Sequence, residues 1–350
     1  MSAGRATAYP RPVIVRRPAL VVLLALLVPA CAPSSVGEAE RKGNVAWLDE
    51  NGTPDAVAAL GRLADTHPAA RTALETRSAF DPNAFRAAWD AIVRGADWGT
   101  AMLRAGLADP KRADLAASAV DKHDPRLVAF TADLEQAIER LSATLQNLNV
   151  ASALAAIGPP ARDAVVRRLT DTATRGAMCR GISSKDASPD ARAALLAAPV
   201  AARDSVNCVD AVVHIAAEDD AALSWLAEKG EPGLLGAAGK EERLPCARLH
   251  VIWTKALAAR PAEGASALTV PLGYAVKRCT AEMDGVLADA IAHQPGTHTV
   301  VIQAIDPFEG YGGGLRATCA ALPMVEGGRD SALVKERARD ALNHGCKVQG

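Results

Sequence analysis

Aromatic side chains are scarce in this 350-residue chain, at 3% of residues, and runs of β-branched and aromatic residues typical of strands are rare. Alanine is instead the dominant residue, at about one in five, and 49% of all residues are hydrophobic. Alanine has the highest helix propensity, whereas strands favour β-branched and aromatic side chains. The composition therefore predicts an all-α protein whose core is sizeable but built from small side chains.

Acidic residues are absent before Glu38, and the whole chain has no basic excess, since its formal net charge is −1. The first 30 residues contain four arginines and no acid, so their removal would change the net charge to −5. Nucleic-acid-binding proteins usually carry a basic patch or a basic excess. We therefore expect a mildly acidic, solvated surface and no nucleic-acid partner.

No sequence motif of an enzyme or a metal site is present. There is neither a Gly-x-Ser-x-Gly elbow nor a His-Glu-x-x-His pattern. His214 and Glu218 lie four residues apart on an expected helix, where a surface contact is a better interpretation than a metal pair. The run 310–314 lacks the Gly-Lys-Ser/Thr ending of a phosphate-binding loop and reads as a connection. We expect a protein that is not an enzyme and that needs no cofactor or metal.

The first 30 residues have the pattern of an export signal. Arg5, Arg11, Arg16 and Arg17 form a basic region, which the apolar run Ala19–Ala30 follows. This run is shorter than the roughly 20 apolar residues that a helix needs to cross a bilayer. It therefore predicts a cleaved signal peptide rather than a lasting transmembrane anchor.

The end of the run, Leu27-Val28-Pro29-Ala30-Cys31, resembles the lipobox of bacterial lipoproteins, from which only Pro29 departs. The resemblance implies a signal peptide over residues 1–30 and a mature chain held at the membrane by acyl chains, such as palmitate, on Cys31. Ala32 is not the Asp that many Gram-negative lipoproteins use to stay at the inner membrane, so the outer membrane is favoured. Ordinary cleavage after Ala32 and a cytosolic protein with a buried apolar helix are the alternatives. Residues 31–43 are expected to form a flexible tether.

Proline and aspartate divide the rest of the chain into short helical patterns. Thr53 is an expected N-cap, with Pro54 in the first turn of its helix, and Asp81-Pro82 begins another helix. Asp109-Pro110 repeats the pattern. The longest helix is predicted from Pro125 to about Leu148, because its apolar residues form one stripe.

The segments 54–63 and 160–169 resemble HEAT-type helices. That resemblance implies an irregular α-solenoid of helical hairpins, a fold that serves as a scaffold for protein partners. An irregular helical bundle is the alternative architecture. A change in composition near residues 157–160 suggests a Cys-free helical subdomain over 44–158 and a Cys-containing helical-repeat subdomain over 159–350.

Six cysteines besides Cys31 lie in the C-terminal half, and an even number in an exported chain indicates disulfides. Alternate cysteines are separated by 67 to 73 residues, which suggests a repeat of about 70 residues with one pair in each. The favoured pairs each close a loop the size of a helical hairpin. Pairing of neighbours out of phase is the alternative, and metal binding is disfavoured because no short Cys-x-x-Cys step is present. The favoured pairs are Cys179–Cys208, Cys246–Cys279 and Cys319–Cys346.

These features together lead to one functional hypothesis and one alternative. The hypothesis is a lipid-anchored protein of the cell envelope that acts as a non-enzymatic scaffold and binds another envelope protein through its helical repeats. The alternative is an envelope enzyme or small-ligand-binding protein whose site is assembled from distant residues. A deep pocket with converging polar groups would favour the alternative, and a shallow groove would favour the scaffold.

Overall fold

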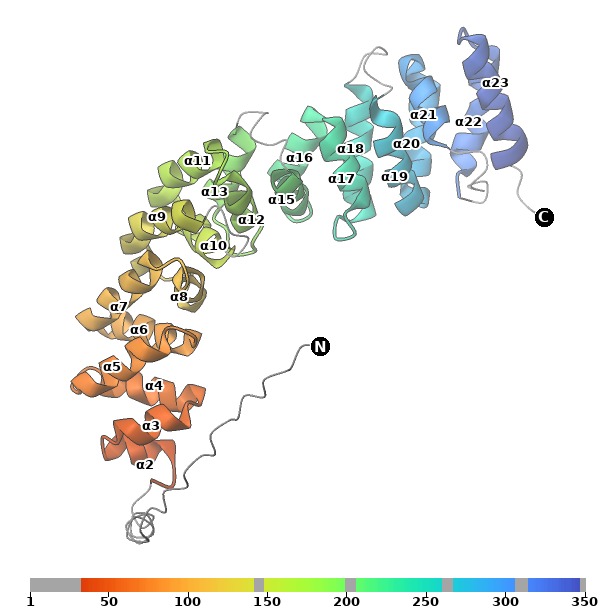
Figure 1. The fold of residues 1–350 in the computed structure, drawn as a ribbon. Helices are drawn as coiled ribbons and strands as arrows, with labels where there is room; N and C mark the ends of the chain where they lie inside the picture. Colours follow the sequence, from red (N-terminus) through yellow and green to blue (C-terminus); the bar gives the residue numbers. More distant parts are fainter. Residues whose placement is uncertain (1–32, 142–147, 199–205, 260–266, 306–313, 347–350) are drawn as a thin grey trace, which may run out of the picture. The chain divides into compact units, whose positions relative to one another are not determined.

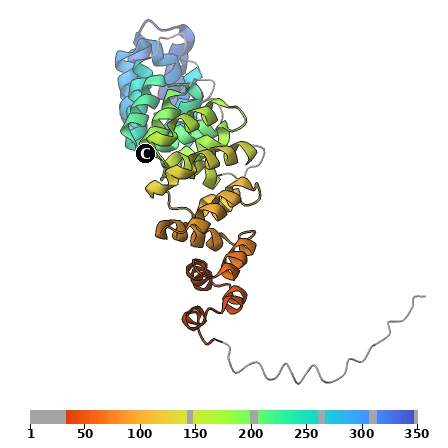
Figure 2. The same ribbon diagram turned by 90° about the vertical axis from the view of Figure 1, so that its left-hand side faces the viewer.

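The structure is a computed structural model that describes residues 33–141, 148–198, 206–259, 267–305 and 314–346 (Figure 1). Within these ranges the chain forms helices joined by turns and loops, and both views show no strand among them (Figure 2). The predicted all-α class is therefore confirmed. The chain divides into two compact units, residues 1–76 and 77–350, which are described separately.

The described part of the first unit consists of short, well-capped helices. Thr53 caps α4 as expected, because its hydroxyl accepts a hydrogen bond from the backbone amide of Ala56 at 3.3 Å. α2 and α3 both pack against α4, whose buried face includes Val57 and Leu60. The helices are α2 (Val36–Arg41), α3 (Val45–Asn51), α4 (Pro54–Leu63) and α5 (Pro68–Arg77), whose last residue belongs to the second unit.

The prediction of a flexible tether over residues 31–43 is wrong for residues 36–41, which form α2. The hydroxyl of Ser35 accepts a hydrogen bond from the backbone amide of Glu38 at 3.2 Å and so caps the helix. Arg62 of α4 donates two hydrogen bonds to the carboxylate of Glu40, at 2.6 and 2.8 Å. Because this partner lies 22 residues away, the composition of the segment by itself did not indicate an ordered helix.

The second unit continues the same kind of structure over many more helices. They are α6 (Pro82–Arg94), α7 (Asp97–Ala108), α8 (Ala113–Ala119), α9 (Thr131–Leu141), α10 (Leu148–Ala156), α11 (Arg162–Thr170), α12 (Arg175–Ile182), α13 (Pro189–Ala197), α15 (Val206–Ala216), α16 (Asp220–Lys229), α17 (Pro232–Lys240), α18 (Cys246–Ala258), α19 (Thr269–Arg278), α20 (Thr280–His293), α21 (His298–Ala304), α22 (Arg316–Gly327) and α23 (Ala332–Asp340).

The helices of the second unit form two rows. One row runs through α6, α8, α10, α12, α15, α17, α19, α21 and α23, and each member contacts the next. In the other row α7, α9, α11 and α13 follow one another in contact, as do α16, α18, α20 and α22. Such contacts are those of helical pairs stacked one on the next. α10 and α12, which lie on either side of the subdomain boundary expected near residue 158, pack against each other.

Side-chain hydrogen bonds between neighbouring pairs recur at a regular sequence separation. Asp284 accepts from Thr318, 34 residues further on, and the ring of His298 contacts Asp330, 32 residues further on. Arg278 donates to the backbone carbonyl of residue 244, again 34 residues away. One helical pair therefore occupies about 32–34 residues in this region. The cysteine spacing of 67 to 73 residues corresponds to two such pairs.

Two of the expected helix boundaries are wrong. The helix predicted from Pro125 to about Leu148 is divided into the 3-10 helix η2 (Pro125–Phe130) and α9, and α10 begins at Leu148; residues 142–147 lie outside the described ranges. Asp109 ends α7 instead of beginning a helix at Pro110. An apolar stripe has the same 3.6-residue period whether one helix or two successive helices bury it, so periodicity could not separate these cases.

Candidate functional site

The predicted lipidation site, Cys31, and the predicted signal peptide lie outside the described residues. Among the residues that the structure describes, no helix combines the length and the apolar character needed to cross a bilayer. The six remaining cysteines all lie within the described residues.

The structure contains the three disulfides that the spacing favoured. They join residues 29, 33 and 27 positions apart, with Cα–Cα distances of 4.9, 5.5 and 5.7 Å. Two of the bridges close a pair of consecutive helices, α18 with α19 and α22 with the chain that follows α23, whereas Cys179–Cys208 joins α12 to α15, which follow one another in the same row. The chain-entropy estimate for loops of this size is about 3–4 kcal/mol of stabilisation. Disulfides form and persist in oxidising, exported environments. The bridges are Cys179–Cys208, Cys246–Cys279 and Cys319–Cys346.

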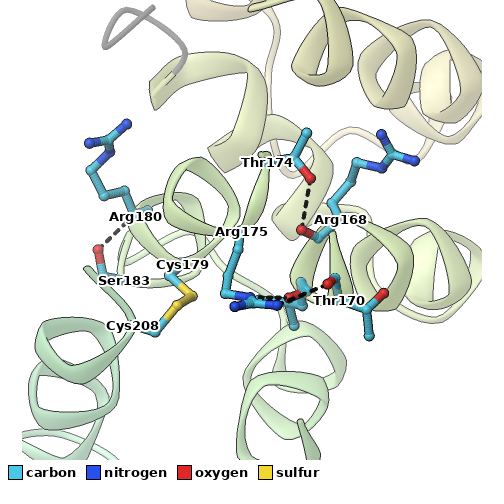
Figure 3. The surroundings of a disulfide bond; sticks show 9 residues. Arg168, Thr170, Thr174, Arg175, Cys179, Arg180, Ser183 and Cys208 are labelled. Atoms are coloured by element: carbon cyan, nitrogen blue, oxygen red, sulfur yellow. Dashed lines mark hydrogen bonds between the residues drawn. A yellow bond between two sulfur atoms is a disulfide. The ribbon is translucent and has the colours of Figure 1, made fainter. Parts of the chain in front are cut away.

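The Cys179–Cys208 bridge joins α12 to α15 (Figure 3). One turn before Cys179, the guanidinium of Arg175 donates to the backbone carbonyls of Leu169 and Thr170, at 2.8 and 2.9 Å. These carbonyls end α11, where no intrahelical donor is available. Both cysteines are fully buried. The cysteine pair is thus surrounded by contacts that fix the helices, which is a structural arrangement and not that of a reactive thiol.

A lysine, a serine and an aspartate converge between the turn after α8, α10 and the turn before α13. The ammonium of Lys122 donates to the hydroxyl of Ser152 at 2.9 Å and to the carboxylate of Asp186 at 3.2 Å. Because the ammonium is paired with a carboxylate, it is a donor to the serine and not a base. Ser152 is also only 2% exposed. The cluster is suited to joining three segments rather than to attacking a substrate.

Histidines and acids do not converge on a metal site within the described ranges, where no group of three or more possible ligands occurs. His293 contacts the carboxylate of Asp289 on the same helix at 2.8 Å. His298 is 5% exposed and lies between the carboxylate of Asp330 and the backbone carbonyl of Ile291, at 3.0 and 2.8 Å. These contacts hold α21 against α20 and against the chain that leads to α23.

A broad groove with a volume of about 590 Å³ crosses three successive helices of one row, α15, α17 and α19. Its floor is the exposed side of α17, where Gly233, Gly236 and Ala237 carry almost no side chain. Its walls include Val270 and Tyr274 of α19, which are 62% and 38% exposed. The other residues that line it are Val209, Asp210, Pro232, Lys240, Glu241 and Pro271.

The glycines of α17 fall into two kinds. A methyl group on Gly239 would lie 2.9 Å from Cβ of Tyr274 and 3.2 Å from the carbonyl oxygen of Pro271, so this glycine permits close packing of α17 on α19. A methyl group on Gly233 would meet nothing within 4 Å, and one on Gly236 would only reach Cγ of Pro271 at 3.8 Å. The last two glycines therefore leave space that no part of the described protein occupies.

The charged residues of the groove are placed unequally. The ammonium of Lys240 lies 4.1 Å from the centre of the Tyr274 ring, a cation–π contact that holds the lysine against the wall. Asp210 is exposed on α15, and its carboxylate makes no hydrogen bond or ion pair with any described residue. The carboxylate of Glu241 accepts a hydrogen bond from the backbone amide of Arg243 at 3.0 Å. It also lies near Arg278, whose pKa is lowered by burial while Glu241 and Glu242 oppose that shift. Asp210 is thus the charged group that the groove leaves available.

A second hollow of about 140 Å³ lies between α18 and α20 and is lined by His250, Thr254 and Asp289, among others. Its histidine is already in contact with the backbone carbonyl of Glu282 at 3.0 Å. The volume is below the range of about 300–1,000 Å³ that is usual for small-molecule sites. The larger groove is therefore the better candidate.

Sequence reasoning did not find the groove, although a signal for it was present. Three glycines occur within the nine residues Pro232–Lys240, a segment that the structure shows to be a helix. Glycine costs about 1 kcal/mol relative to alanine in a helix interior, so this density indicates a close approach or an open face. Which of the glycines packs and which remains open depends on α19, whose position the sequence does not reveal.

Comparison with known proteins adds no identity to this description. No protein-family model, curated protein sequence or solved structure matches the chain.

Proposed function

We propose that this protein is an exported, lipid-anchored scaffold of the cell envelope, which is not an enzyme and which binds a protein partner through its row of stacked helices. The observation that carries the proposal is the groove across α15, α17 and α19. It is broad and open, its lining is mainly apolar, and the ammonium of Lys240 contacts the ring of Tyr274 rather than a carboxylate. Such surfaces are typical of protein recognition by stacked helical pairs.

The proposed location in the cell envelope is supported by the sequence and by the disulfides together. The pattern that ends at Cys31 resembles a lipobox, and the three disulfides suit an oxidising compartment. A protein held by acyl chains at a membrane surface meets its partners in two dimensions, so a shallow groove of modest affinity is sufficient there. The outer membrane is the favoured location.

The proposal is tested by two measurements on the protein from a membrane fraction. The intact mass should be that of residues 31–350 plus acyl chains, with six thiols alkylated only after reduction. A photo-crosslinking amino acid at exposed position 270, in the groove wall, should capture one envelope protein reproducibly, whereas the same amino acid at exposed position 333 in α23 serves as the control. A full-length, unacylated chain would contradict the anchor, and absence of a captured protein at any surface position would contradict the scaffold.

A small-ligand-binding protein is the second candidate, because the groove volume of about 590 Å³ falls within the usual range for ligand sites. Such sites enclose most of their ligand and present several converging polar groups. Screening the purified protein against a metabolite mixture by equilibrium dialysis would decide this. Retention of a small molecule that is lost in a Gly236→Leu variant would favour the second candidate.

A further inference from the structure

The open glycines of α17 are unfavourable for the protein on its own. Glycine is a poorer helix former than alanine, most of all in the interior of a helix, where Gly236 lies. At Gly239 the close packing of α19 explains the residue, because a methyl group there would meet the backbone of that helix. At Gly233 and Gly236 no intramolecular contact does so, since an added methyl group has room at both positions. What these two residues provide is the depth of the groove.

The walls above this floor are apolar and exposed to an unusual degree. Val270 is 62% exposed, although it lies in the first turn of a helix whose other side is buried. Together with the ring of Tyr274 and with Val209 of α15, it leaves an apolar surface around the floor. Burial of apolar surface is favourable, so an apolar side chain that enters the groove would be stabilised there.

The charge of the groove selects among apolar partners. Lys240 is engaged by Tyr274, and Glu241 lies in the field of Arg278, whereas Asp210 at the α15 side has no partner among the described residues. The lining as a whole contains two carboxylates and one ammonium. A cationic group placed beside Asp210 would complete the arrangement, and an acidic group there would be repelled.

We infer that the groove across α15, α17 and α19 binds a segment of a partner protein that presents an apolar side chain to the Gly233–Gly236 floor and a lysine or arginine to Asp210. This inference rests on the proposed scaffold function and specifies the partner's chemistry. The apolar anchor supplies most of the affinity, and the pairing with Asp210 fixes the orientation of the segment. An acidic segment would be repelled by Asp210, and a wholly polar segment lacks the apolar side chain that the floor would bury.

The test is selection of a phage-displayed library of random dodecapeptides on the oxidised full chain, followed by binding of the selected peptides to three variants. Gly236→Leu fills the groove, and a helix tolerates leucine better than glycine, so this variant should fold at least as well as the parent. Asp210→Lys reverses the charge. Gly285→Leu is the matched control, because Gly285 is also an open helix glycine, outside the groove on α20.

The expected result is a set of peptides that share an apolar residue and a lysine or arginine. Their affinity should fall about tenfold or more in Gly236→Leu and in Asp210→Lys, and it should be unchanged in Gly285→Leu. Circular dichroism would establish that all three variants are folded. Peptides that lack a basic residue, or that bind Gly236→Leu as well as the parent, would overturn the inference.

Two outcomes separate this inference from the scaffold function on which it rests. If an envelope protein is crosslinked from position 333 but never from position 270, the scaffold function stands and the groove is not its binding surface. If light scattering shows a dimer that becomes a monomer in Gly236→Leu, the occupant of the groove is a second copy of the chain, and the partner segment inferred here is wrong.

Discussion

At Gly181 the backbone of α12 lies directly against the backbone of α10. A methyl group there would lie 2.6 Å from the carbonyl oxygen of Ala151, so even alanine would require the two helices to separate. Overpacking of this kind typically costs about 1–3 kcal/mol. We expect Gly181→Ala to lower the free energy of unfolding by that amount, measured as a lower urea midpoint by circular dichroism.

The matched control for this prediction is Gly285→Ala on α20. An added methyl group at Gly285 meets nothing within 4 Å, so only the helix propensity changes. We expect this substitution to raise the free energy of unfolding by about 0.5–1 kcal/mol. If both substitutions change the urea midpoint in the same direction, close packing is not what requires glycine at position 181.

Glu38 in α2 is a second place where a single side chain has a measurable signature. Hydrogen bonds from Lys42, followed by those from Ser34, lower its pKa from 4.5 to about 2. The contribution of the carboxylate to α2 is therefore complete above pH 4.5 and is lost as the pH falls toward 2. We expect the side-chain NMR titration of Glu38 to move toward 4.5 in Lys42→Met, because the largest cause of the shift is removed.

Arg41→Met is the control for that titration, since it removes the same charge from the neighbouring position of the same helix without removing the hydrogen bond to Glu38. The pKa of Glu38 should remain close to 2 in this variant. An equal change in both variants would mean that general electrostatics, and not the Lys42 contact, lowers the pKa.

At the scale of elements, many helix ends are capped by side chains from a neighbouring helical pair. The carboxylate of Asp284 on α20 accepts hydrogen bonds from the backbone amides of Ala317 and Thr318 at the start of α22, both at 2.8 Å. Arg175 does the converse at the end of α11. Such contacts satisfy the backbone groups that a helix terminus leaves without intrahelical partners. They also join each helical pair to the next.

Asp284→Ala should therefore destabilise the start of α22 by about 1–2 kcal/mol, the usual effect of losing a cap. The measurement is amide hydrogen exchange, which should accelerate at Ala317 and Thr318. Asp289→Ala serves as the control, because Asp289 lies on the same helix and pairs only with His293 on the surface. Unchanged exchange at both amides in Asp284→Ala would show that the cap does not contribute.

The three disulfides differ in their exposure, and this difference predicts the order in which they are reduced. Both sulfurs of Cys179–Cys208 belong to fully buried residues, whereas both residues of Cys319–Cys346 are partly exposed. A reducing thiolate must reach a sulfur atom directly. We expect partial reduction of the folded protein, followed by alkylation and peptide mass spectrometry, to label Cys319 and Cys346 first and Cys179 and Cys208 last. The order should disappear in denaturant, where all three are accessible.

At the scale of the whole molecule, stability is distributed because contacts connect near neighbours in the sequence. Each disulfide closes a loop of 27 to 33 residues, and all three lie between Cys179 and Cys346. In stacked helical pairs, stability is close to a sum of units and their nearest-neighbour interfaces. Loss of the disulfides should therefore weaken the C-terminal part of the second unit and leave distant helices unaffected.

Complete reduction followed by hydrogen-exchange mass spectrometry tests this expectation. Exchange should increase over residues 175–346 and remain unchanged over α2–α4 in the first unit, which serves as the internal control. A uniform increase over the whole chain would contradict the expectation that stability is a sum of local contributions. It would instead mean that the chain unfolds as one cooperative structure.

Local patterns in the sequence predicted the helical class and favoured the disulfide pairing that the structure contains. Alanine content and proline-initiated caps such as Thr53-Pro54 are local signals, and they act within a few residues. The cysteine spacing favoured this pairing because the partners are near in the chain, 27 to 33 residues apart. The proposed export signal and lipid anchor rest on the same kind of local pattern.

The positions of neighbouring helices, and not the local sequence, determine which residues meet across helices. The structure shows that residues 36–41 form α2, where the carboxylate of Glu40 pairs with Arg62 of α4, and that the predicted helix from Pro125 is divided. It also separated Gly239, which packs against α19, from Gly233 and Gly236, which leave the groove open. The physical reason is common to these cases: local propensity is encoded within a few residues, whereas a groove or an ion pair depends on the position of a neighbouring helix.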